Sequence, residues 1–291
     1  NLFIDKKIDL FIGIDSPDFN MGIHKALKKK SNNKNIQIVS PSVWGWRQGR
    51  IKSIQAYIDL TLCLFNFEHN FYKKVGHNSF HLGHPFFDLN KVNKEEIIKK
   101  YSLDESKRFL SVLPGSRKSE IMNMMPVYRD FIKKHFEKNE DHVYLISAAD
   151  KKLKSMIEKY FDTEKLPIMI AEESMRDFLS ISSLSIVTSG TATLEASILE
   201  CPPVICYKTS SFNYSIISRM LKIDDVGLPN LLLGKRYYME LIQNECNVKN
   251  ILDAVRKTEE LIPYSSENAS LIKDIIKGNG YSEAIKVIKA L

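Results

Sequence analysis

The chain has 291 residues, which is enough for one large domain or, more naturally, for two domains that each have their own hydrophobic core. Apolar residues make up 44% of the sequence and charged residues 26%, a balance typical of soluble globular proteins, and no apolar run reaches the roughly 20 residues of a membrane-spanning helix. The net charge of +7 at pH 7 is compatible with nucleic acid, an anionic membrane surface or a phosphorylated substrate, and charge alone does not choose among them.

The cysteines and the start of the chain narrow the class further. None of the four cysteines belongs to a Cys-x-x-Cys pair, and Cys63 and Cys206 lie in apolar runs, which predicts buried thiols in a reducing cytoplasm. No signal peptide is recognisable, so any membrane contact is expected to be peripheral. The chain begins with Asn1 and soon enters a buried-strand pattern, so we interpret it as a fragment whose first strand–helix units are missing.

The first predicted strand covers residues 8–14 and stops at Asp15. In open α/β sheets, ligands bind at the edge where the carboxyl ends of the strands meet. Asp15 is therefore a candidate for chemistry. The alternative is that it only caps the helix expected at residues 20–30.

An aromatic and basic loop follows the next predicted strand, residues 36–39. It contains Trp44, Trp46, Arg47 and Arg50. Tryptophan interleaved with arginine in a loop indicates an amphipathic surface. The alternative is that the tryptophans only plug the end of the sheet.

A third strand, expected at residues 60–65, is followed by His84 just before Pro85, which holds the histidine in an extended conformation at another strand end. A lone histidine is more often structural than catalytic. Because no second histidine, cysteine or carboxylate stands at metal-ligand spacing from it, we predict no metal site. The charged segment at residues 91–108 then indicates a domain connection with a short helix.

A second strand–helix series begins at residues 109–113 and ends in a small-residue turn that carries Arg117, whose guanidinium can bind a diphosphate as a fork. Alternating patterns of this kind predict a second parallel sheet rather than one barrel. The further strands are expected at residues 143–147, 168–170, 184–187 and 204–207, and the helices at 121–136, 150–160 and 174–181.

The turn after the strand at residues 184–187 contains Ser189, Gly190 and Thr191, and a helix follows it. Helix starts leave N–H groups unpaired and favour negative charge, so this turn predicts a phosphate-binding site. Glu195, about one turn into the helix, is a candidate partner for sugar hydroxyls. The alternative is an ordinary strand-to-helix turn with Ser189 or Thr191 as N-cap.

The last part of the sequence is predicted to be mostly helical. Residues 212–222 have helical spacing that fits a core helix or a membrane-surface helix, with the core the better fit. Asn230 lies in an expected turn with an exposed amide. Further helices are expected at residues 235–244, 248–261, 265–277 and 281–291.

Six motifs occur together and in order within residues 8–247, and as a set they closely resemble the lipid-A-disaccharide synthase family. The motifs are IDSPDFN at 14–20, SPSVWGWR at 40–47, GHP at 83–85, LPGSR at 113–117, SGTATLE at 189–195 and LPNLL at 228–232. The resemblance implies an inverting bacterial glycosyltransferase with two Rossmann-like domains, the GT-B architecture. The family's opening strand and Gly-Glu-x-Ser-Gly-Asp loop are absent from this sequence, so we expect the N-terminal domain to be incomplete here.

The implied reaction joins UDP-2,3-diacylglucosamine to 2,3-diacylglucosamine 1-phosphate (lipid X) and releases UDP, without a cofactor or nucleic acid. The resemblance also implies a peripheral position at the cytoplasmic face of the inner membrane. We expect an acceptor-binding domain at residues 1–90, a connector at 91–108, a UDP-sugar-binding domain at 109–262, and C-terminal helices at 263–291 that pack back on the first domain. The sequence does not indicate the oligomeric state.

An inverting transfer needs a base at the acceptor and positive or N–H groups at the leaving diphosphate. Asp15 is the candidate base, and Arg117 with the turn at 189–191 would hold the diphosphate without a metal. Glu195 would bind the ribose hydroxyls. By resemblance, the donor side also includes Asn230 and Gln243, and the acceptor or membrane side includes Trp44, Trp46, Arg47, Arg50 and His84.

Two alternatives remain open. A UDP-N-acetylglucosamine 2-epimerase or the lipid II-forming transferase would also need a phosphate site and a ribose carboxylate, but we find no match in those families to the tryptophan loop. A non-enzymatic, peripheral membrane-binding module would leave Asp15, Arg117 and Glu195 without a purpose, and it would show no saturable stabilisation by UDP.

Overall fold

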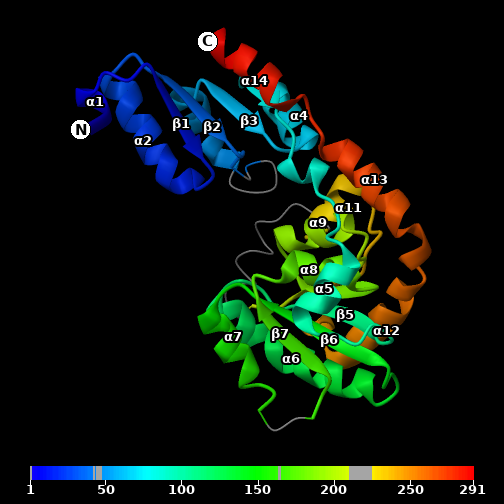
Figure 1. The fold of residues 1–291 in the computed structure, drawn as a ribbon. Helices are drawn as coiled ribbons and strands as arrows, with labels where there is room; N and C mark the ends of the chain where they lie inside the picture. The colour runs from blue at the N-terminus through cyan, green and yellow to red at the C-terminus, as the bar shows by residue number, and fades with distance from the viewer. Residues whose placement is uncertain (1, 42, 44–47, 163–164, 210–224) are drawn as a thin grey trace. The chain divides into compact units, whose positions relative to one another are not determined.

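The computed structural model describes residues 2–41, 43, 48–162, 165–209 and 225–291 (Figure 1). These residues form two compact units. Unit 1 comprises residues 2–87 and 273–291, and unit 2 comprises the described residues from 88 to 272. Helix α13 (Ser265–Ile276) begins in unit 2 and ends in unit 1.

Unit 1 contains a parallel sheet of four strands in the order β1-β2-β3-β4. The strands are β1 (Leu10–Ile14), β2 (Lys34–Ile38), β3 (Leu60–Cys63) and β4 (Ser79–His81). The helices are α1 (Leu2–Asp5), α2 (Pro17–Lys30), α3 (Ile51–Tyr57), α4 (Asn66–Lys74) and α14 (Gly280–Lys289), with short 3-10 turns η1 (Gln48–Arg50) and η2 (Pro85–Asp88).

Buried apolar side chains cover the sheet of unit 1. Ile36 and Leu60 pack with Ala284, so the C-terminal helix α14 completes this part of the core. Ile54 and Tyr72 from α3 and α4 form a second cluster. Strand β1 lies at the sheet edge, and its alternate side chains Leu10, Ile12 and Ile14 are exposed.

Unit 2 contains six parallel strands in the order β10-β9-β8-β5-β6-β7. They are β5 (Arg108–Leu113), β6 (His142–Ala148), β7 (Ile168–Glu172), β8 (Leu184–Thr188), β9 (Pro203–Tyr207) and β10 (Glu240–Ile242). Its other elements are α5 (Lys94–Tyr101), α6 (Lys118–Phe136), α7 (Lys151–Glu158), α8 (Met175–Ile181), α9 (Thr191–Ile198), α11 (Leu228–Leu233), α12 (Val248–Glu259), η3 (Gln243–Glu245) and η4 (Ile262–Tyr264). The strand order reverses direction between β5 and β8, which is the point where doubly wound sheets bind ligands.

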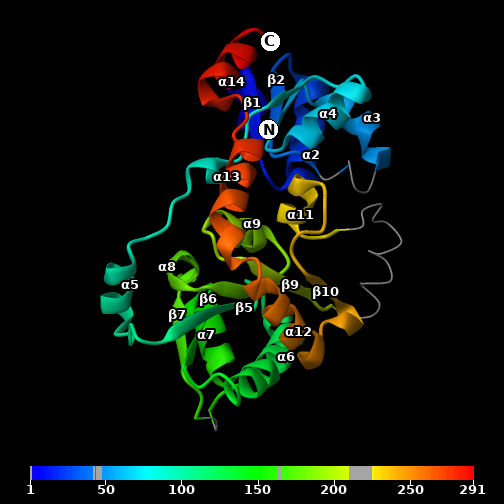
Figure 2. The same ribbon diagram turned by 90° about the vertical axis from the view of Figure 1, so that its right-hand side faces the viewer.

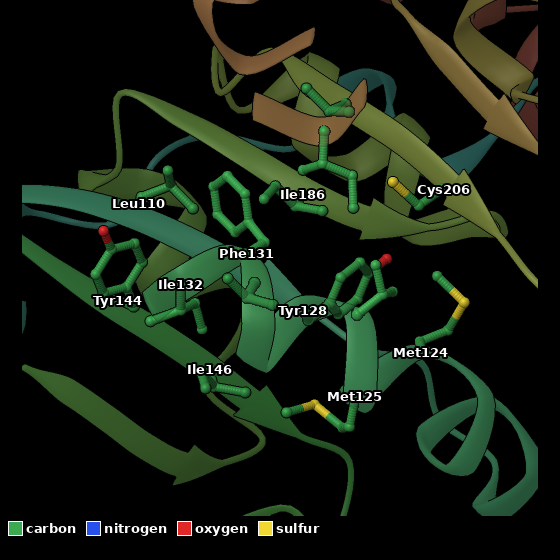
Figure 3. Close-up of a cluster of buried hydrophobic side chains, with 14 of the residues drawn as sticks. Leu110, Met124, Met125, Tyr128, Phe131, Ile132, Tyr144, Ile146, Ile186 and Cys206 are labelled. Carbon is green, nitrogen blue, oxygen red and sulfur yellow. The ribbon is translucent and has the colours of Figure 1, made fainter. Parts of the chain in front are cut away.

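The core of unit 2 follows from the two-residue period of a strand. Leu110 and Val112 of β5 face a cluster that α6 and α12 cover, and Phe109 and Leu113 belong to clusters with residues of α8. Figure 3 shows four α6 side chains, Met124, Met125, Tyr128 and Phe131, within this buried cluster beside the strands. In Figure 2, α6 and α12 lie side by side, and they are in contact along this face.

The α/β class with two parallel sheets is confirmed, but several elements differ from the sequence prediction. The helix expected at residues 235–244 is wrong, because 240–242 pair with β9 as strand β10 and 243–245 form the turn η3. Helix α2 begins at Pro17 rather than at residue 20, as proline favours the first turn of a helix. The expected connector contains α5, which packs against α8. The helix expected at 212–222 lies outside the described residues.

Candidate active site

A pocket of about 810 Å³ opens at the carboxyl ends of β5, β6 and β8 in unit 2. Its walls come from the segments that follow β5, β6, β7 and β8, chiefly the turns before α6, α8 and α9, and we call it the strand-end pocket. It is lined by Val92, Leu113, Gly115, Ser116, Arg117, Glu120, Ser147, Ala148, Ala149, Glu173, Met175, Arg176, Asp177, Thr188, Ser189, Gly190, Thr191 and Ala192. The pocket therefore lies at the reversal point of the sheet, and it brings together Arg117 and the turn at 189–191, which the sequence placed on different elements.

The first wall is the start of α9. Gly190 is the N-cap residue, and no side chain caps this helix, so the N-cap role considered for Ser189 or Thr191 is wrong. The hydroxyl of Thr193 instead donates to the Gly190 carbonyl at 2.8 Å. An uncapped helix start that lines a pocket presents N–H groups and positive partial charge to an anion.

The second wall is the turn before α6. Glu120 accepts hydrogen bonds from the N–H groups of Ser116 at 2.9 Å and Arg117 at 3.2 Å, and its other oxygen pairs with Arg117 Nη1 at 2.8 Å. Gly115 has a φ of +106°, and a Cβ there would lie 2.4 Å from a Glu120 oxygen, so the turn requires glycine. The Arg117 side chain is 78% exposed, which leaves the guanidinium accessible to a ligand.

The third wall contributes Arg176, which the sequence reasoning missed. Arg176 lies in the first turn of α8, and its Nε donates to a Glu195 carboxylate oxygen at 2.8 Å. Glu195 is 6% exposed and does not line the strand-end pocket, whereas Arg176 does. The only sequence signal for Arg176 was its position soon after the predicted strand at 168–170. The structure thus gives Glu195 a protein partner, and its expected contact with ribose stays a prediction.

Asp15 lies in unit 1, directly after β1, and is exposed. It has a φ of +49° and Ser16 has one of +38°, a left-handed pair that ordinary residues seldom adopt. Two buried amides fix this turn, because Asn20 and Gln37 donate to the Asp15 carbonyl oxygen at 2.7 and 3.0 Å. Ser16, not Asp15, takes the N-cap position of α2, so the capping alternative for Asp15 is wrong.

Residues 1–278 match the protein family described as lipid-A-disaccharide synthetase. The chain belongs to the lipid-A-disaccharide synthase family. The lipid-A-disaccharide synthase of Acinetobacter baylyi is 35% identical over 288 residues, which cover 94% of this chain and 73% of the relative. Lipid-A-disaccharide synthase 2 of Legionella pneumophila strain Philadelphia 1 is 37% identical over 269 residues, which cover 91% of this chain and 69% of the relative.

Solved structures with the same fold are much more distant in sequence. The UDP-GlcNAc 2-epimerase of Neisseria meningitidis bound to UDP-GlcNAc matches with a TM-score of 0.66 at 11% identity, covering 100% of this chain and 78% of that one. The Staphylococcus aureus MnaA–UDP co-structure matches with a TM-score of 0.59 at 12% identity, covering 99% and 76%. These likenesses show the fold alone, two Rossmann-like units of the GT-B class. The assignment to the family rests on the sequence matches.

The amide that the synthase motif LPNLL supplies is not exposed, so the prediction of an exposed amide at Asn230 is wrong. The side chain is fully buried. Its Nδ2 donates to the Tyr238 carbonyl at 2.9 Å and to a Glu240 oxygen at 2.7 Å, and its Oδ1 accepts from the N–H groups of Tyr237 at 2.9 Å and Tyr238 at 2.8 Å. All of its hydrogen-bonding capacity is used within the fold. Asn230 therefore fixes the chain before β10 and does not line the strand-end pocket, and its expected place on the donor side stays a prediction.

Gln243 also bonds to the backbone. Its side-chain oxygen accepts from the Thr209 N–H at 2.8 Å, and its side-chain nitrogen donates to the Thr209 carbonyl at 3.1 Å. These two hydrogen bonds hold η3 against the segment that directly follows β9. Gln243 does not line the strand-end pocket.

Of the residues expected on the acceptor or membrane side of the synthase, the structure describes only Arg50 and His84. Arg50 forms an ion pair with Asp18 in the first turn of α2. His84 is 7% exposed, and its Nδ1 accepts from the Phe86 N–H at 3.2 Å. Burial lowers the pKa of His84 to about 4, so it is neutral at pH 7, which favours the structural interpretation. The tryptophans of the loop and Arg47 lie outside the described residues.

In the part of the chain that the structure describes, no group of three or more histidine, cysteine, aspartate or glutamate side chains is arranged to hold a metal ion. None of the helices formed by these same residues has the length and apolar character needed to cross a bilayer.

Proposed function

We propose that this chain transfers a 2,3-diacylglucosaminyl group from its UDP derivative to 2,3-diacylglucosamine 1-phosphate, forming the lipid A disaccharide 1-phosphate and UDP. The observation that carries the proposal is the convergence of Arg117 and the uncapped start of α9 on the strand-end pocket, in a chain of the lipid-A-disaccharide synthase family. A pocket with these groups suits a nucleoside diphosphate. The likeness to 2-epimerases concerns the fold alone and supports no second function.

The transfer proceeds by a single displacement with inversion. The Asp15 carboxylate takes the proton from the acceptor 6-hydroxyl, the freed oxygen attacks the anomeric carbon of the donor sugar, and UDP leaves from the opposite face. Charge that develops on the leaving diphosphate is stabilised by Arg117 and by the N–H groups at the start of α9. No metal is required in this scheme, because these groups supply the positive charge.

The lipid substrates give the membrane part of the proposal. Acyl chains on both sugars require the enzyme to work at a lipid surface, so we propose a peripheral position at the cytoplasmic face of the inner membrane. The loop with Trp44, Trp46 and Arg47 supports this, because its residue types suit the boundary between acyl chains and anionic head groups.

The test is a calorimetric titration of the chain with UDP. Arg117→Ala should weaken UDP binding roughly 10- to 150-fold, the usual cost of one charge-assisted contact, and should leave uridine binding unchanged. Arg256→Ala is the matched control, since Arg256 is an exposed arginine in the last turn of α12 and does not line the strand-end pocket. The assignment of the UDP site to the strand-end pocket would be contradicted if the wild-type chain did not bind UDP. It would also be contradicted if Arg117→Ala and Arg256→Ala bound UDP with equal affinity.

A further inference from the structure

The left-handed turn after β1 has a counterpart after the neighbouring strand. Val39 directly follows β2 and has a φ of +69°, a conformation that is unusual for a β-branched residue. Asp15 and Ser16 occupy the matching place after β1, since Ile14 and Ile38 are partners in the parallel pair. Strained backbone of this kind persists only where the surrounding contacts hold it, and it often marks a functional site.

One buried amide bonds to both of these strand ends. Gln37 of β2 is 1% exposed, and its Nε2 donates to the Asp15 carbonyl oxygen at 3.0 Å. The same nitrogen donates to the carbonyl oxygens of Ile38 at 3.0 Å and Val39 at 3.3 Å. A second buried amide, that of Asn20 on α2, donates to the Asp15 carbonyl oxygen at 2.7 Å. The Asp15 carbonyl is therefore held from two elements, β2 and α2.

Two neighbours fix the place and the orientation of these amides. A Cβ on Gly13, the β1 partner of Gln37, would lie 2.7 Å from Gln37 Oε1 and 2.9 Å from the Asn20 amide nitrogen, so both amides need glycine there. His24 is fully buried, and its Nε2 lies 3.1 Å from Gln37 Oε1. Because the amide nitrogen of Gln37 faces carbonyl oxygens, its amide oxygen is the acceptor and His24 Nε2 carries the hydrogen. Burial lowers the pKa of His24, which keeps the ring neutral at pH 7.

We propose that Gln37 and Asn20 are positioning residues for the Asp15 carboxylate, and that they act by holding the Asp15 carbonyl in its left-handed turn. This inference rests on the proposed function, in which Asp15 is the base. Neither amide touches the reacting atoms. A turn that relaxed to ordinary dihedral angles would carry the carboxylate in another direction, and a general base works only within hydrogen-bond reach of its proton.

The other buried amide of β2 provides a matched control. Asn35 lies two residues before Gln37, on the same face of the strand, and it is fully buried. Its Nδ2 donates to the carbonyl oxygens of His24 at 3.0 Å and Tyr57 at 2.8 Å, which uses both of its N–H groups. Removal of either amide costs buried hydrogen bonds, but only removal of Gln37 releases the Asp15 carbonyl.

The test is steady-state turnover with both lipid substrates, at a temperature where every variant is folded. Gln37→Ala should lower kcat roughly 10- to 100-fold and leave UDP affinity within about twofold of wild type. Asn35→Ala should keep kcat within about threefold of wild type, although it also loses stability. In an Asp15→Ala background, Gln37→Ala should lower turnover no further, because Gln37 acts through Asp15. Gln37→Met keeps the volume without the hydrogen bonds and serves if the alanine variant does not fold.

Hydrogen exchange gives a readout that does not depend on activity. The Asp15 N–H donates to the Ile38 carbonyl at 3.0 Å. Its exchange should become at least about tenfold faster in Gln37→Ala, and by a clearly smaller factor in Asn35→Ala. Equal acceleration in the two variants would mean that Gln37 does not hold the turn.

The outcomes separate this inference from the function beneath it. A wild-type chain without transferase activity overturns the proposed function and this inference with it. If the wild-type chain is active and Asp15→Ala is not, a normal kcat for Gln37→Ala shows that only the inference is wrong. Equal losses of kcat in Gln37→Ala and Asn35→Ala also refute it, because turnover then follows stability. A further loss in the double variant refutes it as well, since Gln37 then acts independently of Asp15.

Discussion

The buried amide of Asn230 allows a sharp test of its structural role. Asn230→Asp changes one atom group and almost no volume, but it replaces an NH2 donor with an oxygen. That donor now bonds to the Tyr238 carbonyl at 2.9 Å and to a Glu240 oxygen at 2.7 Å, and Glu240 is itself 6% exposed. The variant therefore places a new carboxyl group against a buried carboxylate and a buried carbonyl.

The expected loss can be worked out from these contacts. An acceptor left unsatisfied in the interior costs about 1–3 kcal/mol. At low pH the new carboxyl can stay protonated and donate to Glu240, so one of the two bonds is kept, and the free energy of unfolding should fall by about 1–3 kcal/mol. Proximity to Glu240 raises the folded-state pKa of the new carboxyl above the unfolded value of about 3.9. Each pH unit between those two pKa values then removes about 1.4 kcal/mol of stability.

The assay is urea unfolding at pH 5 and pH 8. Asn230→Asp should be less stable than wild type at both values, and the deficit should be larger at pH 8. Asn244→Asp is the matched control, because Asn244 is exposed in η3, and its effect should stay within about 0.5 kcal/mol. Equal stability of the two variants at pH 8 would refute the buried-donor argument. Native stability with lost UDP binding would support a place for Asn230 at the donor site.

Three further outcomes are expected. In an assay with both lipid substrates, Asp15→Ala should lower turnover by roughly 10²- to 10⁴-fold without changing UDP affinity. Asp18→Ala should instead cost at most about 1 kcal/mol of stability, since its pair with Arg50 is exposed, and the reverse pattern would mean that the base is misassigned. Burial lowers the pKa values of His77 and His84 to about 4, so the unfolded chain binds more protons as pH falls from 6.5 to 4. Stability should therefore fall through that window and be insensitive to both histidines above it, which urea midpoints would check. The fraction of the chain that sediments with anionic vesicles should decrease when salt is added and when Trp46 is replaced (Trp46→Ala). A bound fraction that neither change lowers would count against a membrane role for the loop.

The sequence determined the parts of the site that depend on local order. Parallel strands end at a common edge, so Arg117 after β5 and the turn at 189–191 after β8 were expected on the same side of one sheet, and both line the strand-end pocket. Two glycines shape these turns, because Gly115 is required by the turn that presents Arg117, and Gly190 is the N-cap residue of α9, which has no side-chain cap. These are properties of a few consecutive residues, which a sequence displays directly.

Only the tertiary structure decided which side chains are used up inside the fold. Residues 240–242 have no strand signal strong enough to outweigh the helical pattern around them, and they become β10 because β9 offers an open edge. The same pairing buries Glu240 beside Asn230 and turns a motif amide into a structural one. Arg176 meets Glu195 across 19 positions of sequence. Burial and pairing of this kind depend on contacts between distant segments, and periodicity or spacing within one segment carries no record of them.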